Sequence, residues 1–175
     1  TLLVAHGALL VAHGTLLDQE QTQIDPALAQ REIESNFTSV VALATAFARH
    51  FEERGTGTLA VISSIAGDRG RKSNYVYGAA KAGVSVFLEG LSARLHARGV
   101  RVLNIKPGPV DTPMTVDHRK TLVFARARDV AAGILTTIDR GRGEAYLPWF
   151  WRPIMAVVRA MPEPALRRIP FLAGR

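Results

Sequence analysis

The chain has no cysteine among its 175 residues, and this absence excludes several kinds of chemistry. Without thiols it can form no disulfide, no thiolate metal site and no thiol nucleophile, which fits a reducing compartment. No uninterrupted apolar run approaches the ~20 residues that a membrane-spanning helix requires. No basic-then-apolar signal peptide opens the chain, whose first residues resemble a strand from inside a domain. We therefore expect a cytoplasmic protein, either free or at the inner face of the membrane.

Hydrophobic residues are abundant, and positive charge is concentrated near the C-terminus. They make up 47% of the chain, which is long enough for one domain with a real core. Of the net charge of +7, most comes from residues 140–175, where seven arginines face only Glu144 and Glu163. Such a tail suits either an anionic surface or a solvated arginine-rich face. We expect no nucleic-acid partner and no metal site.

Short apolar runs alternate with helix-type segments along the chain. The N-terminal stretch "LLVAHGALLVAHGT" is a tandem copy, of which only one copy is expected to occupy a strand. Proline and glycine punctuate the later segments, and either Asn74 or Ser73 can cap the second long helix. The expected helices cover 26–54, 74–98 and 128–139, and the expected strands 58–64, 100–110 and 144–147. This alternation predicts an α/β fold with a parallel sheet in three αβα layers. We expect residues 1–148 to form the catalytic domain and 149–175 an amphipathic extension.

Four polar residues occur near the expected ends of these elements. Ser64 ends a strand, Tyr77 and Lys81 lie four residues apart on the helix that follows, and Asn36 lies on the preceding helix. A spacing of four places the phenol and the ammonium on one helix face. A cation there stabilises a phenolate, whose ordinary pKa is about 10. A serine hydroxyl can hold a carbonyl oxygen beside that phenol.

Each of these residues also has a plain structural interpretation. Tyr77 could be a half-buried helix tyrosine, and Lys81 a solvated lysine. Ser64 could merely end its strand, with Ser63 offering a competing hydroxyl, and Asn36 could bond a helix backbone. Tyr75 is a poorer candidate than Tyr77, because no lysine follows it by four residues.

Taken together, these stretches resemble the short-chain dehydrogenase/reductase family. The matching segments are "NFTSV", "AVISSIAG", "YGAAKAG" and "IKPGPVDTPM", with Gly14, rather than Gly7, in the register of the family's turn after strand 4. The resemblance implies an oxidoreductase that uses NADP or NAD. It implies catalytic roles for Asn36, Ser64, Tyr77 and Lys81, with Lys81 also binding the nicotinamide ribose and Asn36 holding a water in a proton relay.

The segment "PGPVDTPM" is also open to two interpretations. Pro107 and Gly108 could simply end a strand and turn the backbone. The resemblance implies instead that the segment binds the cofactor, through Pro107, Gly108, backbone groups near Val110, and Thr112. It further implies that Gly14 and Tyr77 lie at the cofactor, and that the loop after Met114 covers the substrate.

One feature of the family has no counterpart in this sequence. The glycine-rich turn Thr-Gly-x-x-x-Gly-x-Gly, which brings a helix N-terminus to the pyrophosphate, does not occur. The chain thus resembles the C-terminal part of a Rossmann-type doubly wound sheet, strands 4–7 with their helices. We expect the "LLVAH" strand to form an exposed apolar edge. We also expect that these 175 residues alone neither bind dinucleotide tightly nor turn over.

The tail carries an apolar stripe at helical spacing, with arginines elsewhere. Its members are Trp151, Ile154, Met155, Val158 and Met161. The stripe suits core, lid or dimer packing, or alternatively a membrane interface. Together with "AGDRGRKSNYVYGAAKAG", the tail resembles bacterial relatives of decaprenylphosphoryl keto-pentose reductase, which act on a lipid-linked sugar.

The resulting prediction is an enzyme that reduces a ketone or oxidises a secondary alcohol by hydride transfer, with Tyr77 as general acid/base. Its substrate would be a small-molecule or lipid-linked carbonyl compound, and the resemblance implies a homodimer or tetramer. Two alternatives stay open: a truncated, non-catalytic partner subunit, and a membrane-surface binding module that acts through the tail.

Overall fold

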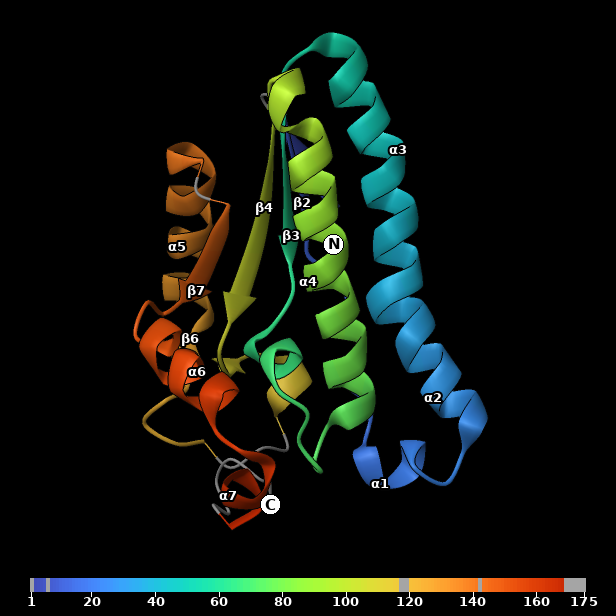
Figure 1. The fold of residues 1–175 in the computed structure, drawn as a ribbon, viewed down its shortest axis with the longest axis vertical. Helices are drawn as coiled ribbons and strands as arrows, with labels where there is room; N and C mark the ends of the chain where they lie inside the picture. Colours follow the sequence, from blue (N-terminus) through green and yellow to red (C-terminus); the bar gives the residue numbers. More distant parts are fainter. Residues whose placement is uncertain (1, 6, 117–119, 142, 169–175) are drawn as a thin grey trace.

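A five-stranded sheet runs through the centre of the molecule (Figure 1). The structure, a computed structural model, describes residues 2–5, 7–116, 120–141 and 143–168. The strand order is β1-β2-β3-β4-β7, and the strands from β2 onward pair in parallel. The strands are β1 (Leu2–Ala5), β2 (Ala8–Val11), β3 (Gly57–Ile62), β4 (Val100–Pro107) and β7 (Glu144–Leu147). Two short strands, β5 (Val110–Asp111) and β6 (Ala125–Arg126), pair separately.

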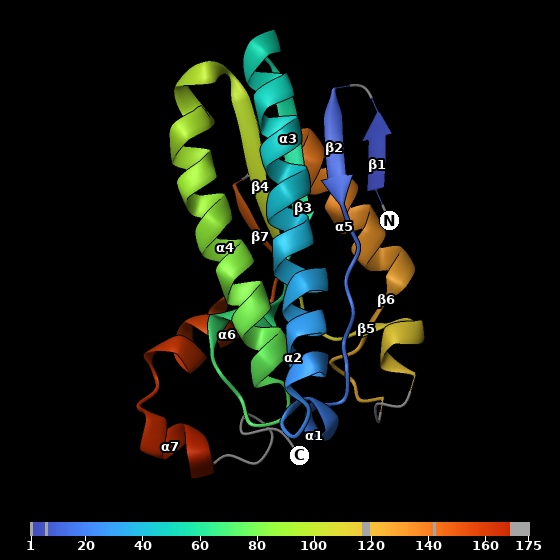
Figure 2. The same cartoon turned by 90° about the vertical axis from the view of Figure 1, so that its right-hand side faces the viewer.

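Helices cover both faces of this sheet, as the two views show (Figures 1 and 2). One face carries α2 (Pro26–Ile33), α3 (Ser39–Arg54) and α4 (Tyr75–Leu95), and the other carries α5 (Ala127–Arg140). Side chains such as Val40, Leu88 and Leu59 form the core beneath α3 and α4. Val130 and Ile134 of α5 pack on Leu103 from the opposite side. The prediction of a doubly wound α/β fold in three layers is confirmed.

The N-terminal duplication differs from the prediction, because both copies form strands. The first copy is β1, which folds back through a turn at Gly7 and pairs antiparallel with β2. The φ angle of Gly7 is +78°, a conformation that favours glycine. The expectation of one occupied copy with β2 at the edge is therefore wrong. β1 is the edge strand, with Leu2 and Leu3 exposed.

The long helix expected over 26–54 contains a local irregularity. Between α2 and α3 the backbone forms one π-helical turn, Glu34–Thr38, and Asn36 lies inside it. A π turn inserts a residue into the helical spacing and often marks a functional site. Asp25 caps α2 by accepting from the N–H groups of Ala27 and Leu28, as the Asp-Pro pair predicts.

The C-terminal elements return to the sheet. A short 3₁₀ turn, η2 (Ile65–Asp68), follows β3, and α6 (Trp151–Ala160) packs beside it. Trp151, Met155 and Val158 are buried against Ile65 and Tyr146, so these members of the stripe belong to the core, whereas Ile154 is exposed. The helix α7 (Glu163–Arg168) follows, and residues 169–175 of the tail lie outside the described residues. Among the described helices, none has both the length and the apolar character needed to cross a membrane.

Candidate active site

Ser64, Tyr77 and Lys81 come together where β3 ends and α4 begins. Parallel strands present their carboxyl ends at one edge of a sheet, where α/β proteins bind ligands. Ser64 directly precedes η2, and its Oγ accepts a hydrogen bond of 3.1 Å from the Ala66 N–H. Tyr77 and Lys81 lie on the first two turns of α4, and the Lys81 Nζ is 5.6 Å from the centre of the Tyr77 ring. Three of the four predicted catalytic side chains thus share one site.

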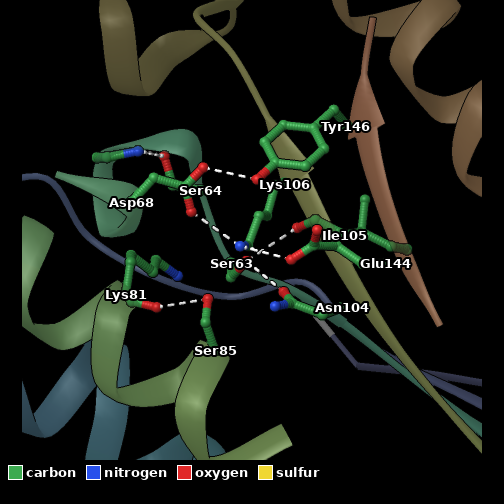
Figure 3. Close-up of polar contacts among 11 residues, drawn as sticks. Ser63, Ser64, Asp68, Lys81, Ser85, Asn104, Ile105, Lys106, Glu144 and Tyr146 are labelled. Atoms are coloured by element: carbon green, nitrogen blue, oxygen red, sulfur yellow. Dashed lines mark hydrogen bonds and ion pairs between the residues drawn. The ribbon is translucent and has the colours of Figure 1, made fainter. Parts of the chain in front are cut away.

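The two neighbouring serines have different surroundings (Figure 3). Ser63 is fully buried, and its hydroxyl donates to the Asn104 side chain and, at 3.3 Å, to the Ile105 carbonyl. Ser64 is only partly buried and lies next to the phenol of Tyr77. Ser63 therefore stabilises the contact between β3 and β4, while Ser64 has a hydroxyl at the site.

Asn36 is fully buried and holds the loop that follows β2. Its Nδ2 donates to the Thr15 carbonyl at 3.0 Å and to the Glu32 carbonyl at 3.1 Å. Its Oδ1 accepts from the Thr15 N–H at 3.3 Å. The bond to the Glu32 carbonyl is the helix-backbone contact that the plain structural interpretation of Asn36 anticipated, whereas Thr15 belongs to the loop. The role of Asn36 in holding a water stays a prediction.

Gly14 lies where no larger residue fits. A Cβ at this position would come within 2.6 Å of Asn36 Oδ1 and 3.4 Å of Lys81 Nζ. Glycine here lets the loop after β2 approach both side chains. The duplicated Gly7, by contrast, lies in the β1–β2 turn with open space around it.

The acidity of Tyr77 depends on what surrounds the phenol. Burial raises the pKa of Tyr77 to about 12, and interaction with the Ser64 hydroxyl only partly opposes this rise. The charge of Glu32 also raises the pKa of this phenol, whereas that of Arg71 lowers it. Desolvation is therefore the largest influence on the pKa of this phenol. That the Lys81 ammonium, together with an oxidised nicotinamide, brings the pKa of Tyr77 down stays a prediction.

Lys81 is itself perturbed by burial. Its pKa is lowered to about 8, and the nearby carboxylate of Glu32 only partly offsets this. Within the described chain, the ammonium donates only to the Ile62 carbonyl, at 3.3 Å. An ammonium has three donors, so two remain for a ligand. This donor set suits the hydroxyl groups of a ribose.

The segment from Pro107 to Thr112 lies at the same edge of the sheet, after β4. The Gly108 N–H donates to the Leu147 carbonyl at 2.9 Å, and the Val110 carbonyl accepts from Thr115 Oγ1 at 2.6 Å. These two groups are therefore used within the chain. A Cβ on Gly108 would overlap the Trp151 indole, so α6 also requires glycine here. Part of the loop expected to cover the substrate, 117–119, lies outside the described residues.

Comparison with known proteins identifies the family. The model of the family described as short chain dehydrogenase matches residues 7–122, which is more than half of the chain. The chain belongs to the short-chain dehydrogenase family. The edge of the sheet described above is where this short-chain dehydrogenase gathers its polar side chains.

Two bacterial relatives illustrate how far the match extends. An uncharacterized oxidoreductase of Mycobacterium tuberculosis is 35% identical over 150 residues, which cover 86% of this chain and 60% of the relative. An uncharacterized oxidoreductase of Streptomyces coelicolor is 36% identical over 144 residues, covering 82% and 57%. This short-chain dehydrogenase chain thus spans about 60% of the length of these relatives.

A solved structure shows the same fold. A short-chain dehydrogenase from Burkholderia cenocepacia, determined in complex with NADP, superposes with a TM-score of 0.79. It is 24% identical, and the match covers 91% of this chain and 68% of the other. At this identity the likeness establishes the fold of the short-chain dehydrogenase chain.

Two charged residues at the site of this short-chain dehydrogenase were missed in the sequence. Glu32 is almost fully buried, and its Oε2 accepts from Thr15 Oγ1 and from the Leu17 N–H, each at 3.1 Å. Arg71 lies near enough to Tyr77 to influence its pKa. Glu32 could have been found from its spacing of four to Asn36. Arg71 lies in a polar loop, and its sequence context gives no such signal.

Proposed function

We propose that this chain carries the proton-transfer site of an NAD(P)-dependent oxidoreductase that reduces a ketone or oxidises a secondary alcohol. The observation that supports it best is the meeting of Ser64, Tyr77 and Lys81 at the carboxyl edge of the sheet. Membership of the short-chain dehydrogenase family and the NADP complex of the Burkholderia neighbour support the choice of cofactor.

The residues present fit a nicotinamide cofactor. Lys81 has two donors that the described chain leaves for ribose hydroxyls. Gly14 lets the loop after β2 approach Lys81, and the turn at Pro107–Thr112, at the same edge of the sheet, would hold the nicotinamide ring. NAD(P)H, when bound, supplies the hydride that the protein side chains lack. Orientation of the carbonyl and transfer of the proton fall to Ser64, Tyr77 and Lys81.

The direction of proton transfer depends on the pKa of Tyr77. A phenol with a pKa of about 12 is protonated at neutral pH and can donate to a carbonyl oxygen as that oxygen gains negative charge. The Ser64 hydroxyl holds the same oxygen in line. In the alcohol-to-ketone direction Tyr77 must first lose its proton, and the Lys81 ammonium favours that loss through its charge.

The deciding experiment is steady-state reduction of a panel of ketones by the whole protein with NADPH and with NADH. Tyr77→Phe removes the donated proton and is expected to lower kcat by roughly 10²- to 10⁴-fold. Ser64→Ala is expected to lower kcat as well, while Ser73→Ala, an exposed serine in the same loop, leaves it unchanged. Full activity of Tyr77→Phe with an unchanged thermal midpoint would refute the assignment.

The substrate and the assembly are proposed in the same terms. The apolar C-terminal elements beside η2 support a hydrophobic or lipid-linked carbonyl compound as the substrate.

The outer surface of α3 and α4, which lie side by side on one face, supports assembly as a homodimer or tetramer (Figure 2). Light scattering of the whole protein tests the assembly. A membrane role has less support, because Trp151, Met155 and Val158 are buried. A cytoplasmic location stays a prediction.

A further inference from the structure

A cleft of about 330 Å³ lies at the start of α4. It is lined by the loop at Gly70–Lys72, by Tyr75 and by Leu166 and Arg167 of α7. Tyr75 is two residues before Tyr77 on α4, so the cleft lies near the helix turn that carries the phenol. Its volume suits part of a small molecule.

Positive charge dominates the walls of this cleft. Arg71, Lys72 and Arg167 line it, against one carboxylate, Glu163. Glu163 is paired with Arg167 on the same helix. Among the described residues, neither Arg71 nor Lys72 forms an ion pair, so these two positive charges have no ion-pair partner of their own.

Of these two residues, Arg71 is the stronger candidate for binding an anion. It is partly buried, whereas Lys72 is exposed, and burial lowers the pKa of its guanidinium. Withdrawing a charge from water without a partner is unfavourable. A guanidinium held in this way is stabilised when an anion binds, and its planar donors match a carboxylate or a phosphate.

Arg71 lines the cleft together with Tyr75, which is two residues before Tyr77 on α4, and the charge of Arg71 lowers the pKa of the Tyr77 phenol. We propose that the cleft binds an anionic group, a phosphate or a carboxylate, of the substrate whose carbonyl is reduced at Tyr77. This inference rests on the proposed function and adds to it a class of substrate. The anionic group would be anchored at Arg71, with Lys72 adding charge at the rim.

Calorimetric titration of the whole protein at low ionic strength tests the site without turnover. The probes are octyl phosphate, octanoate and inorganic phosphate. We expect saturable binding of at least one probe, and Arg71→Met is expected to weaken it about tenfold or more. Arg71→Lys should recover part of the affinity. Arg128→Met, which removes an exposed arginine on α5, is the matched control and should bind as the wild type does.

Preference among the probes identifies the source of the charge. Binding of octyl phosphate over octanoate indicates a phosphate, and the reverse indicates a carboxylate. Equal losses in Arg71→Met and Arg128→Met, or no saturable binding, overturn the proposal. Binding only to vesicles containing anionic lipid, unaffected by Arg71→Met, also overturns it in favour of a surface contact. If anion binding fails while Tyr77→Phe still abolishes reduction of neutral ketones, only this inference is lost.

A second, independent observation concerns a buried polar cluster behind Ser64 (Figure 3). The Lys106 Nζ lies 2.8 Å from Asp68 Oδ1 and 2.6 Å from Glu144 Oε2. The Tyr146 hydroxyl donates to the other oxygen of Asp68 at 2.7 Å. The side chains of Asp68 and Lys106 are 3% and 5% exposed, so both carboxylate oxygens of Asp68 are held away from water.

Asp68 ends the 3₁₀ turn that Ser64 begins. Ser64 caps the turn, and Asp68 ties its far end to β4 and β7 through Lys106 and Tyr146. We infer that Asp68 and Lys106 are positioning residues that fix the Ser64 hydroxyl relative to Tyr77. Buried ion pairs contribute little net stability but can specify a unique arrangement.

A double-mutant cycle with Ser64 separates positioning from general stability. In the otherwise wild-type protein, Lys106→Met is expected to lower kcat roughly tenfold or more, because small displacements of reacting groups are costly. In the Ser64→Ala background the same change should have little further effect. Lys106→Arg should restore part of kcat. Equal fold losses in both backgrounds would show that Lys106 acts independently of Ser64 and would overturn the inference.

Discussion

At the scale of single residues, burial influences the pKa values of Tyr77 and Lys81 more than neighbouring charges do. The short-chain dehydrogenase pair Tyr77 and Lys81 lies as the spacing of four predicted, with the ammonium 5.6 Å from the ring centre. Burial nevertheless moves both pKa values toward the neutral form of each side chain, to about 12 and about 8. The sequence shows which groups are neighbours, whereas their desolvation depends on everything packed around them.

Lys81 gives a prediction of pH dependence. Its pKa of about 8 in the folded state lies below the ordinary 10.5, so between these values the unfolded state binds more protons. Folding is therefore favoured increasingly as pH rises through this window, by up to ~1.4 kcal/mol per pH unit. We expect the free energy of unfolding of the wild type to rise relative to Lys81→Met between pH 7 and pH 9.5, by urea denaturation. A constant difference would show that Lys81 is not desolvated.

Gly14 gives a prediction of steric fit. Gly14→Ala places a methyl group 2.6 Å from Asn36 Oδ1 and is expected to destabilise the fold by about 1–3 kcal/mol. Gly70→Ala is the matched control, since nothing lies within 4 Å of its Cβ position. Urea unfolding of both variants checks the difference. Equal stability of the two would mean that the loop after β2 moves away without cost.

At the scale of elements, one face of α6 is part of the core. Its stripe, read in the sequence as either core or membrane-facing, packs on Ile65 of η2 and Tyr146 of β7. Helical spacing identifies an apolar face but does not say what covers it. Only the return of the chain beside η2 settles that α6 supports the turn after Ser64.

Adjacent valines of α6 test this packing. Val158 is 3% exposed and Val157 is 63% exposed. Val158→Ala is expected to lower the free energy of unfolding by about 2 kcal/mol through lost burial and a residual cavity. Val157→Ala should change it by less than about 0.5 kcal/mol, as surface substitutions generally do. If a membrane covered the exposed side of α6, where Val157 lies, Val157→Ala would instead be the variant that weakens vesicle binding.

At the scale of the whole molecule, the chain holds the side chains proposed for proton transfer but has no glycine-rich pyrophosphate turn. The sequence contains no Thr-Gly-x-x-x-Gly-x-Gly stretch, and the chain spans about 60% of the length of its bacterial relatives. The edge of the sheet next to β2 is occupied by β1, which pairs antiparallel with β2. A helix N-terminus provides much of the binding of a pyrophosphate.

A titration follows from this division. The 175 residues alone are expected to show no saturation with NADPH at micromolar concentrations, followed by fluorescence, because the pyrophosphate has no glycine-rich turn to bind. A short-chain dehydrogenase that carries the glycine-rich turn is the control and should saturate. Tight binding by residues 1–175 would show that Lys81 and the Pro107–Thr112 segment suffice for the cofactor.

Much of the fold and part of the site could be predicted from the sequence. Most elements were predicted to within a few residues. The signals were the short apolar runs, the Asp25-Pro26 start of α2 and the glycine at 99, all of which act locally. The pairing of β1, the π turn at Asn36 and the buried position of Glu32 were not predicted. Each depends on contacts between segments distant in the chain.

By itself, the sequence determined the alternation of strands and helices and the spacing of Ser64, Tyr77 and Lys81, since periodicity and turn residues act within a few positions of the chain. Only the tertiary structure decided how strongly each group is desolvated, which charges near Arg71 and Lys106 find partners, and which face of α6 is covered. These properties arise from water exclusion by neighbouring elements, and no local pattern of residues encodes it.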